Sequence, residues 1–445
     1  MKKERKRLAI VALIMSCVIL ISCGRHGVIV PLEYYAIKQY QPFLGETWCT
    51  ESNFEKGNAY LLQVYNGCQV GAEAGSEVRG GCSAFRNGNF HGRNLDWFIR
   101  DYAMLVIHIP ATEGRYASVG VVSSCADVNS SLIASGVVPD SLRDILPVRT
   151  TDGINEKGVA VNVNIILKEC VRGEAGDVLW QRDGYVPTTG NGGGAPVAQA
   201  AIPRYILDNC ASVDEAIEKV AKLNVVEGVQ GVLAAECLHF FVSDCEKSAA
   251  FEWYNNQFVV TEYHYDAVSR AYRSAKGMPA IMTNFYNCKL EEVYREGEDW
   301  YEPLYEAHPF AMGMERFSLI EEGLSEVNSQ KAAENHISKV CFSRFYTSQY
   351  EGELWYTENA GFYGPYSYYP GWEGRINYWN EKMPGIVERY GSFDQQMQRI
   401  VGREDSYNWY TAYSIVYDLA GRNFVIRPQE GYYDRDWIRF TLDGR

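Results

Sequence analysis

Cys82 is the residue whose sequence surroundings best fit covalent chemistry, because it follows two glycines and opens a short apolar stretch. A thiol attacks only as thiolate, so it needs a base or a positive field beside it. The chain has seven histidines, and none stands in a recognisable signature around a cysteine. The other base available is the cysteine's own α-amine, whose ordinary pKa is about 7.7 to 8.0. That amine exists only after a cut immediately before Cys82, and Gly80 and Gly81 would allow the strained backbone that such a cut requires.

The segment around Cys82 predicts a β-hairpin. Residues on either side of the Asn-Gly-Asn run at 87–89 read as strands, and this run is typical of a tight turn because Asn and Gly tolerate positive φ. Such a hairpin would bring Arg93 and Asp96 across from Cys82, where they could stabilise a thiolate and hold an amine. The alternative is an ordinary Arg–Asp ion pair beside an idle thiol.

The remaining chain predicts an α+β fold. Strand-like and helix-like patterns follow one another without a linker that would divide the body. The clearest stretches are a turn and alternating strand at 152–167, an amphipathic helix at 212–226, meander strands at 239–263, a helical zone at 313–340 and a hairpin at 410–428. Strands, helices and strands in this order are most simply arranged as sheets with helices on their outer faces.

The hairpin motif is also where the chain resembles a known family. Cys-Ser followed by FHGRNLDW is similar to the start of the choloylglycine hydrolase family, which includes bile salt hydrolases and penicillin V acylases. Six further motifs recur in the family's order: DGINEKGVAV (152–161), ILDNCASVDEAIEKVAKLNVV (206–226), HFFVSDCEKSAAFEW (239–253), MTNFYN (282–287), ERFSLI (315–320) and YTAYSIVYDLAGRNFVIRP (410–428). One such match would be weak, whereas the ordered set covers most of the chain after residue 82.

The resemblance implies a four-layer αββα sandwich of the N-terminal nucleophile hydrolase type. It also implies hydrolysis of a linear, non-peptide amide through a thioester on the cysteine, without a cofactor or a metal. By position, it assigns Cys82 as nucleophile and as base through its freed amine, Arg93 as stabiliser of the thiolate, Asp96 as partner of the amine, Asn284 as oxyanion donor and Arg316 as a residue that orders the site.

The chain departs from the family pattern at the second oxyanion donor. Counted without gaps from Gly158, the family's asparagine falls on Ile165, which offers only a backbone N–H. Asn164 would fit with a shift of one residue. Both candidates therefore stay open at this point.

The first residues read as an export signal. A basic start, MKKERKR, precedes an apolar run that is too short to predict a membrane span, and residues 1–22 are expected to be removed. The run ends in LISCG, which resembles a bacterial lipobox, so Cys23 would be acylated. A single-pass anchor helix without lipid is the alternative. We expect an extracytoplasmic, lipid-anchored protein of the cell envelope, at the outer membrane or cell surface.

The predicted domains are then an anchor and pro-segment at 23–81 and a hydrolase domain at 82–445. A cut before Cys82 would separate the anchor from the enzyme. Either the pro-segment stays bound as a small subunit, or the enzyme is shed. A homo-oligomer is left open as a further partner.

Composition narrows the class of substrate. A net charge of −14 argues against nucleic acid as a partner. The 32 tyrosines suit an apolar pocket with polar hydroxyls, and so a small amphipathic amide: a conjugated bile acid, an N-acyl amide or penicillin V. The rival class is a catalytically inactive surface lipoprotein that binds glycan or lipid on the aromatic-rich insert at 352–380.

Overall fold

The computed structural model describes residues 44–49, 53–67, 80–97, 104–123, 146–167, 170–172, 178–180, 193–226, 236–307, 313–341, 380–392, 410–428 and 437–444. Cys23, the export signal at 1–22 and all but the last residue of the insert at 352–380 lie outside these ranges. Among the described residues, no helix combines the length and the apolar character needed to cross a membrane.

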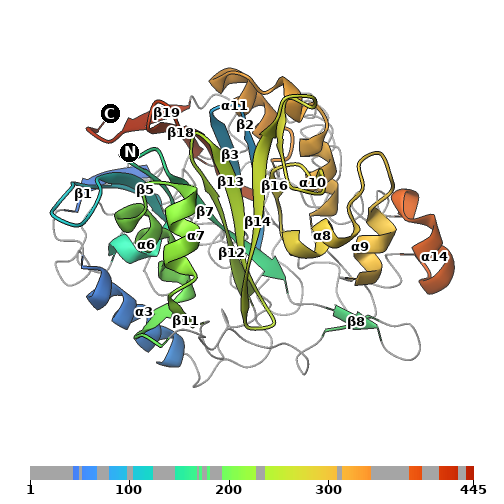
Figure 1. Ribbon diagram of the computed structural model, residues 1–445, viewed down its shortest axis with the longest axis horizontal. Helices are drawn as coiled ribbons and strands as arrows, with labels where there is room; N and C mark the ends of the chain where they lie inside the picture. The colour runs from blue at the N-terminus through green and yellow to red at the C-terminus, as the bar shows by residue number, and fades with distance from the viewer. Residues whose placement is uncertain are drawn as a thin grey trace, which may run out of the picture.

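Two large sheets form the body of the molecule (Figure 1). The nine-stranded sheet runs in the order β1 (Leu44–Trp48), β4 (Met104–Ile109), β5 (Ser118–Ser123), β6 (Thr150–Asn155), β7 (Ala160–Leu167), β12 (Glu236–Ser243), β13 (Lys247–Tyr254), β14 (Gln257–Asp266) and β15 (Ala271–Arg273). The six-stranded sheet runs in the order β16 (Ile281–Met282), β2 (Gly80–Asn87), β3 (Phe90–Trp97), β17 (Tyr410–Asp418), β18 (Asn423–Pro428) and β19 (Ile438–Thr441). Two short pairs, β8 (Cys170–Arg172) with β9 (Val178–Trp180) and β10 (Pro196–Ala198) with β11 (Asn224–Val226), lie apart from them.

Helices cover the outer face of each sheet (Figure 1). The nine-stranded sheet carries α3 (Phe54–Gly67), α6 (Ile202–Asn209) and α7 (Val213–Val220). The six-stranded sheet carries α10 (Met314–Glu321) and α11 (Gln330–Ser338), with α8 (Asn287–Val293), α9 (Tyr301–Ala307) and α14 (Pro384–Tyr390) beside them.

The two sheets bury a common apolar layer. Val106 of β4 and Val121 of β5 share one cluster with Ile415 of β17 and Ile426 of β18, so β-branched side chains of both sheets meet there. This packing suits strands because β-branched residues fill a pleated surface well. With helices outside each sheet, the order of layers is αββα, which confirms the predicted α+β sandwich.

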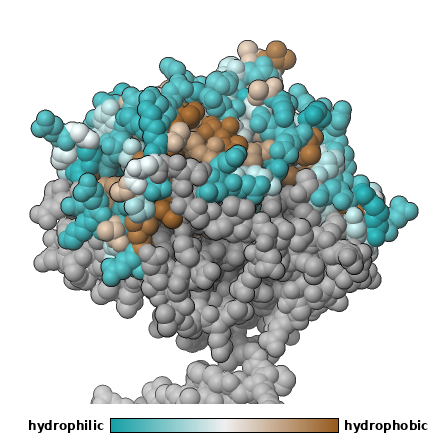
Figure 2. Space-filling model, turned by 60° about the horizontal axis from the view of Figure 1, so that its bottom comes forward, coloured by the Kyte–Doolittle hydropathy of each residue, from teal (hydrophilic) through white to brown (hydrophobic). Residues whose placement is uncertain are grey.

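Local predictions around the sheets are also confirmed. β2 and β3 form the expected hairpin, with Gly88 at φ +53° in its turn. The helical zone at 313–340 contains α10 and α11. On the face drawn in Figure 2, the described residues form a mainly hydrophilic surface with separate hydrophobic patches between the polar side chains.

Part of the segment predicted as anchor and pro-segment is built into this fold. β1 pairs parallel with β4 at the edge of the nine-stranded sheet, with Leu44 opposite Met104. Leu61 of α3 is buried in the same apolar cluster as α6 and α7. The segment before Cys82 thus adds an edge strand and a covering helix to the nine-stranded sheet.

Candidate active site

Cys82 lies near the start of β2, with no exposed surface. In the antiparallel pair with β3, Cys82 is opposite Leu95, and Arg93 is opposite Ala84. Since i and i+2 residues of a strand share a face, the thiol and Arg93 both face the nine-stranded sheet. The Nη2 atom of Arg93 is 3.8 Å from the Cys82 Sγ, and it also donates to the Val163 carbonyl at 2.7 Å.

A buried carboxylate orients Arg93 from the nine-stranded sheet. The Arg93 Nε lies 3.2 Å from the Oδ1 of Asp152, and neither side chain is exposed. The hydroxyl of Tyr413 donates to Asp152 Oδ2, and the Tyr417 hydroxyl is 3.4 Å from Oδ1. Arg93 therefore has a counterion that fixes its plane while its Nη2 reaches the sulfur. Sequence reasoning missed Asp152 as a site residue, although it opens the motif DGINEKGVAV.

Asp96 lies on the other face of the same sheet. It is opposite Gly81, and its carboxylate accepts from Arg316 Nη1 at 3.2 Å and from Thr411 Oγ1 at 2.7 Å. A separation of three residues places Arg93 and Asp96 on opposite faces of a strand. The structure thus separates the two side chains that the hairpin was expected to set together, and Asp96 connects to Cys82 through Arg316.

A β-bulge in β17 makes this two-sided arrangement possible. The pairing with β3 shifts between Thr411 and Tyr413, so Ala412 is an extra residue. Thr411 then shares a face with Asp96, and Tyr413 shares a face with Leu95. Without the extra residue, both side chains would point to one side of the sheet.

Asn284, between β16 and α8, holds the backbone of Cys82. Its Oδ1 accepts from the Cys82 N–H at 2.9 Å and from Arg316 Nη2, while its Nδ2 donates to the Ile165 carbonyl at 2.6 Å. Two donors at one oxygen and a carbonyl at the nitrogen leave a single consistent orientation of the amide. Asn284 therefore accepts from the nitrogen of Cys82, and its role as oxyanion donor stays a prediction.

Arg316 completes the clamp from the first turn of α10. Its Nη1 donates to the Cys82 carbonyl, so one guanidinium contacts the nucleophile's own backbone, Asp96 and Asn284. Gly313 caps the helix at φ +92°, and a Cβ there would lie 2.8 Å from Arg316 Nη2 and 2.8 Å from the Thr283 Cβ. Only glycine combines this backbone conformation with room for the arginine.

The Cys82 thiol is mostly protonated at neutral pH. Burial raises the pKa of Cys82 from 9.0 to about 11, while Arg93 lowers it, Asp96 raises it and Arg316 lowers it. A hydrogen bond with the backbone of Ile165 also lowers the thiol pKa. The positive field is present, but desolvation of the thiolate outweighs it.

Of the two candidates for the second oxyanion donor, Ile165 shares a buried cluster with Cys82, and the choice between them stays a prediction. The amide of Asn164 points elsewhere: its Nδ2 lies 3.4 Å from the Met282 carbonyl and 3.3 Å from the Thr283 carbonyl. Its Oδ1 accepts from Asn162 Nδ2 at 2.7 Å. The described part of the chain has no group of three or more His, Cys, Asp or Glu side chains that could hold a metal ion.

Comparison with known proteins gives matches to amide hydrolases. Residues 84–269 match the family of linear amide C-N hydrolases, choloylglycine hydrolase family. A penicillin V acylase from Pectobacterium atrosepticum is 33% identical over 116 residues, which cover 25% of this chain and 27% of that protein. The chain therefore matches about a quarter of the length of that curated relative.

Two solved structures give weaker likenesses. A mutant of conjugated bile acid hydrolase from Clostridium perfringens has 14% identity and a TM-score of 0.37, with 82% of this chain and 94% of that chain covered. Penicillin V acylase from Agrobacterium tumefaciens has 14% identity and a TM-score of 0.34, with 82% and 86% covered. The sequence match to the choloylglycine hydrolase family begins within β2 and ends after β14, so the chain is similar to that family over residues 84–269.

Proposed function

We propose that this chain hydrolyses a linear, non-peptide amide, with Cys82 as nucleophile after self-cleavage of the Gly81–Cys82 bond. The observation that carries the proposal is the clamp on the nucleophile's own main chain. Asn284 accepts from its N–H, Arg316 donates to its carbonyl, and Arg93 contacts its sulfur. A buried structural cysteine does not require side-chain hydrogen bonds to its backbone nitrogen. An N-terminal nucleophile does, because that nitrogen must be held in place.

Self-cleavage would begin with attack of the Cys82 sulfur on the Gly81 carbonyl carbon. The peptide C–N bond breaks, the nitrogen of Cys82 takes a proton and becomes an amine, and the acyl group passes to sulfur. Water then hydrolyses this thioester and releases the carboxylate of Gly81. The free amine is left beside the Asn284 oxygen, which already accepts from that nitrogen at 2.9 Å.

Turnover would use the same sulfur and the new amine. The amine takes the thiol proton, and the thiolate attacks the carbonyl carbon of the substrate amide. The leaving amine receives the proton as the C–N bond breaks, and water resolves the thioester to free acid and thiol. The proposed donors to the oxyanion are the N–H of Ile165, which shares a buried cluster with Cys82, and the Asn284 amide, which is bound to the Ile165 carbonyl.

The acyl part of the substrate is expected to be apolar. Cys82 belongs to a buried cluster with Leu95 and Ile165, and Leu238 packs against it. The proposed substrates are therefore conjugated bile acids, N-acyl amides or penicillin V, whose acyl groups suit such surroundings.

A substrate panel tests the proposed activity. Purified protein and Cys82→Ala are incubated with glyco- and tauro-conjugates, N-acyl amino acids and penicillin V, and the released amine is measured. We expect release from at least one class by the unsubstituted protein and none by Cys82→Ala. Equal release by the two proteins would refute the proposal.

We further propose that the segment before Cys82 stays bound after the cut. Asn58 of α3 donates to the Pro196 carbonyl at 2.9 Å and accepts from the Ala198 N–H at 2.8 Å, and β1 keeps its ladder with β4. The Cys49 N–H also donates to the His108 carbonyl at 2.8 Å. If Cys23 is acylated, these contacts would hold the enzyme to its anchor without a covalent link.

Native mass spectrometry of the cleaved protein tests this retention. We expect one complex that separates into two chains only under denaturing conditions. Recovery of a folded, active large chain without the small one would show that the enzyme is shed.

A further inference from the structure

The carbonyl of Thr283, directly before Asn284, is held by two side chains of the nine-stranded sheet. His239 Nε2 lies 3.0 Å from this oxygen, and Asn164 Nδ2 lies 3.3 Å from it. His239 and Asn164 are opposite one another in the pairing of β12 with β7. None of these residues has any exposed surface: Thr283, Asn284, His239 and Asn164. A pair of neighbouring strands thus reaches across to the segment that carries Asn284.

The hydrogen-bond partners define the protons on His239. A carbonyl only accepts, so Nε2 carries a hydrogen. The Nδ1 atom lies 3.1 Å from Oε1 of Glu252, on the adjacent strand β13. Glu252 in turn accepts from the backbone N–H groups of Asn287 at 2.7 Å and Cys288 at 2.8 Å. His239 and Glu252 are therefore hydrogen-bonded to each other in the interior, with Nε2 directed at the Thr283 carbonyl.

This pair holds both ends of one short segment. His239 binds the carbonyl of Thr283, and Glu252 binds the N–H groups at the start of α8. Asn284 stands between these two anchor points. Its amide must meet three partners at once, the Cys82 N–H, Arg316 and the Ile165 carbonyl, so a small shift of the segment would break at least one contact.

We propose that His239, supported by Glu252, is a positioning residue for Asn284 in the amide hydrolysis. The inference rests on the proposed function, because Asn284 matters only if Cys82 is the nucleophile. It also gives Asn164 a different task from oxyanion binding, as the second donor to the Thr283 carbonyl. Nothing in the spacing of HFFVSDCEKSAAFEW indicates the task, but its hairpin places His239 and Glu252 on adjacent strands.

The test compares His239→Phe with His239→Gln and a matched control. Gln can still donate to the Thr283 carbonyl, whereas Phe cannot. His108→Phe is the control, because His108 is an equally buried histidine of the same sheet, in β4, where its ring stacks on Trp48. Each protein is measured for kcat, for KM and for the fraction of chains that begin at Cys82, so that kcat is expressed per cleaved site.

We expect His239→Phe to lower kcat by about 10-fold to 100-fold with KM changed by no more than about 3-fold, since a displaced catalytic group slows the chemical step. His239→Gln should recover most of that loss, and His108→Phe should stay within about 2-fold of the unsubstituted protein. If His239→Phe does not fold, His239→Asn replaces it, because its amide is too short to reach the Thr283 carbonyl.

Two results would overturn the inference while the proposed function stands: a kcat of His239→Phe equal to that of His108→Phe, or no recovery in His239→Gln. A merely structural role would lower the yield or stability of His239→Phe without changing kcat per cleaved site. Amine release by Cys82→Ala equal to that of the unsubstituted protein would instead refute the proposed function, and the inference with it.

Discussion

Burial raises the pKa of the Cys82 thiol more than its positive surroundings lower it. With a pKa of about 11, only about one thiol in 10⁴ is ionised at pH 7. The strongest opposing influence is Arg93, whose Nη2 lies 3.8 Å from the sulfur. The effect of Arg93 on the thiol pKa can be measured by substituting this residue.

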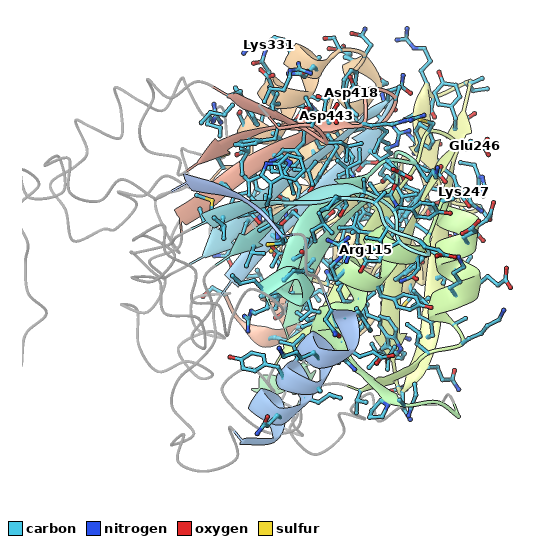
Figure 3. The ribbon with its side chains drawn as sticks, turned by 90° about the vertical axis from the view of Figure 1, so that its left-hand side faces the viewer. Arg115, Glu246, Lys247, Lys331, Asp418 and Asp443 are labelled. Carbon is cyan, nitrogen blue, oxygen red and sulfur yellow. The ribbon has the colours of Figure 1, made fainter. Side chains whose placement is uncertain are left out.

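Arg93→Met tests that influence. The substitution keeps a long side chain and removes the charge that most lowers the pKa of Cys82, so we expect the thiol pKa to rise and alkylation to slow at every pH between 7 and 9. Iodoacetamide labelling of the Cys82 peptide, followed by mass spectrometry, gives the rate. Lys331→Met is the control, because Lys331 has a 72% exposed side chain and lies at the edge of the molecule (Figure 3). A rate for Arg93→Met equal to or faster than that of the control would contradict the prediction.

Substitutions of Asn284 separate its two proposed tasks. Asn284→Leu removes the oxygen that accepts from the Cys82 N–H and the nitrogen proposed as an oxyanion donor, whereas Asn284→Asp restores only an acceptor. If donation to the oxyanion matters, both variants should lose about 10²-fold to 10³-fold in kcat. Recovery of Asn284→Asp to within 10-fold of the unsubstituted protein would show that acceptance alone is needed. Thermal unfolding checks that each variant is folded.

The sequence predicted the centre of the site better than its surroundings. Cys82, Arg93, Asn284 and Arg316 come together as the motifs implied. Asp152 and Thr411 were missed. Asp152 contacts Tyr413, which is 261 positions away, and Thr411 contacts Asp96, which is 315 positions away. No local spacing reveals such contacts, which depend on how two sheets and a bulge are stacked.

Among the elements, a turn of one sheet packs against a turn of the other at a position that requires glycine. Gly158, in the turn between β6 and β7, has φ +85°, and a Cβ there would lie 2.8 Å from the Leu419 carbonyl oxygen in the turn between β17 and β18. The close approach brings backbone of one sheet against backbone of the other. This contact helps to fix the spacing of the sheets around the buried Arg93–Asp152 pair.

Gly158→Ala should therefore be more damaging than an alanine at an open glycine. Gly277 has a similar φ of +88° but nothing within 4 Å of its added Cβ, so Gly277→Ala isolates the backbone cost. We expect the free energy of unfolding to fall by about 1 kcal/mol in Gly277→Ala, from the backbone conformation alone. In Gly158→Ala it should fall by about 3 kcal/mol, because overpacking against Leu419 adds to the backbone cost. Urea unfolding measures both, and equal losses would mean that the contact with Leu419 is not important.

Elements with local signals were predicted, and those that depend on distant partners were not. The β2–β3 hairpin and the helices at 313–340 follow from turn residues and apolar periodicity. β1 was not expected, because it is an edge strand whose partner, β4, lies far along the chain and pairs with it in parallel. The bulge in β17 was missed for the same reason, since only the pairing with β3 reveals it.

For the whole molecule, the αββα order follows from the sequence pattern together with the family resemblance. What the pattern could not show is the number of polar groups sealed between the layers. Two of them are neutral histidines: burial lowers the pKa of His91 to about 3 and the pKa of His336 to about 4. Both values lie well below those of an unfolded chain.

These histidines predict a loss of stability in mild acid. Below pH 6.5 the unfolded chain binds a proton at each histidine and the folded chain does not, so the free energy of unfolding falls as pH falls. For two such groups the loss is about 3 kcal/mol between pH 6.5 and 5, a range above most carboxyl pKa values. His336→Gln, which can still donate to the Ile320 carbonyl, should remove about half of it. A flat profile in urea unfolding would contradict this explanation.

The central claim concerns one bond of the whole chain, between Gly81 and Cys82. Intact mass and N-terminal sequencing of protein that turns over an amide test it most directly. The account predicts two chains, one of which starts at Cys82, and a single uncut chain in Cys82→Ala. Turnover by protein in which the nitrogen of Cys82 is still joined to Gly81 would contradict it.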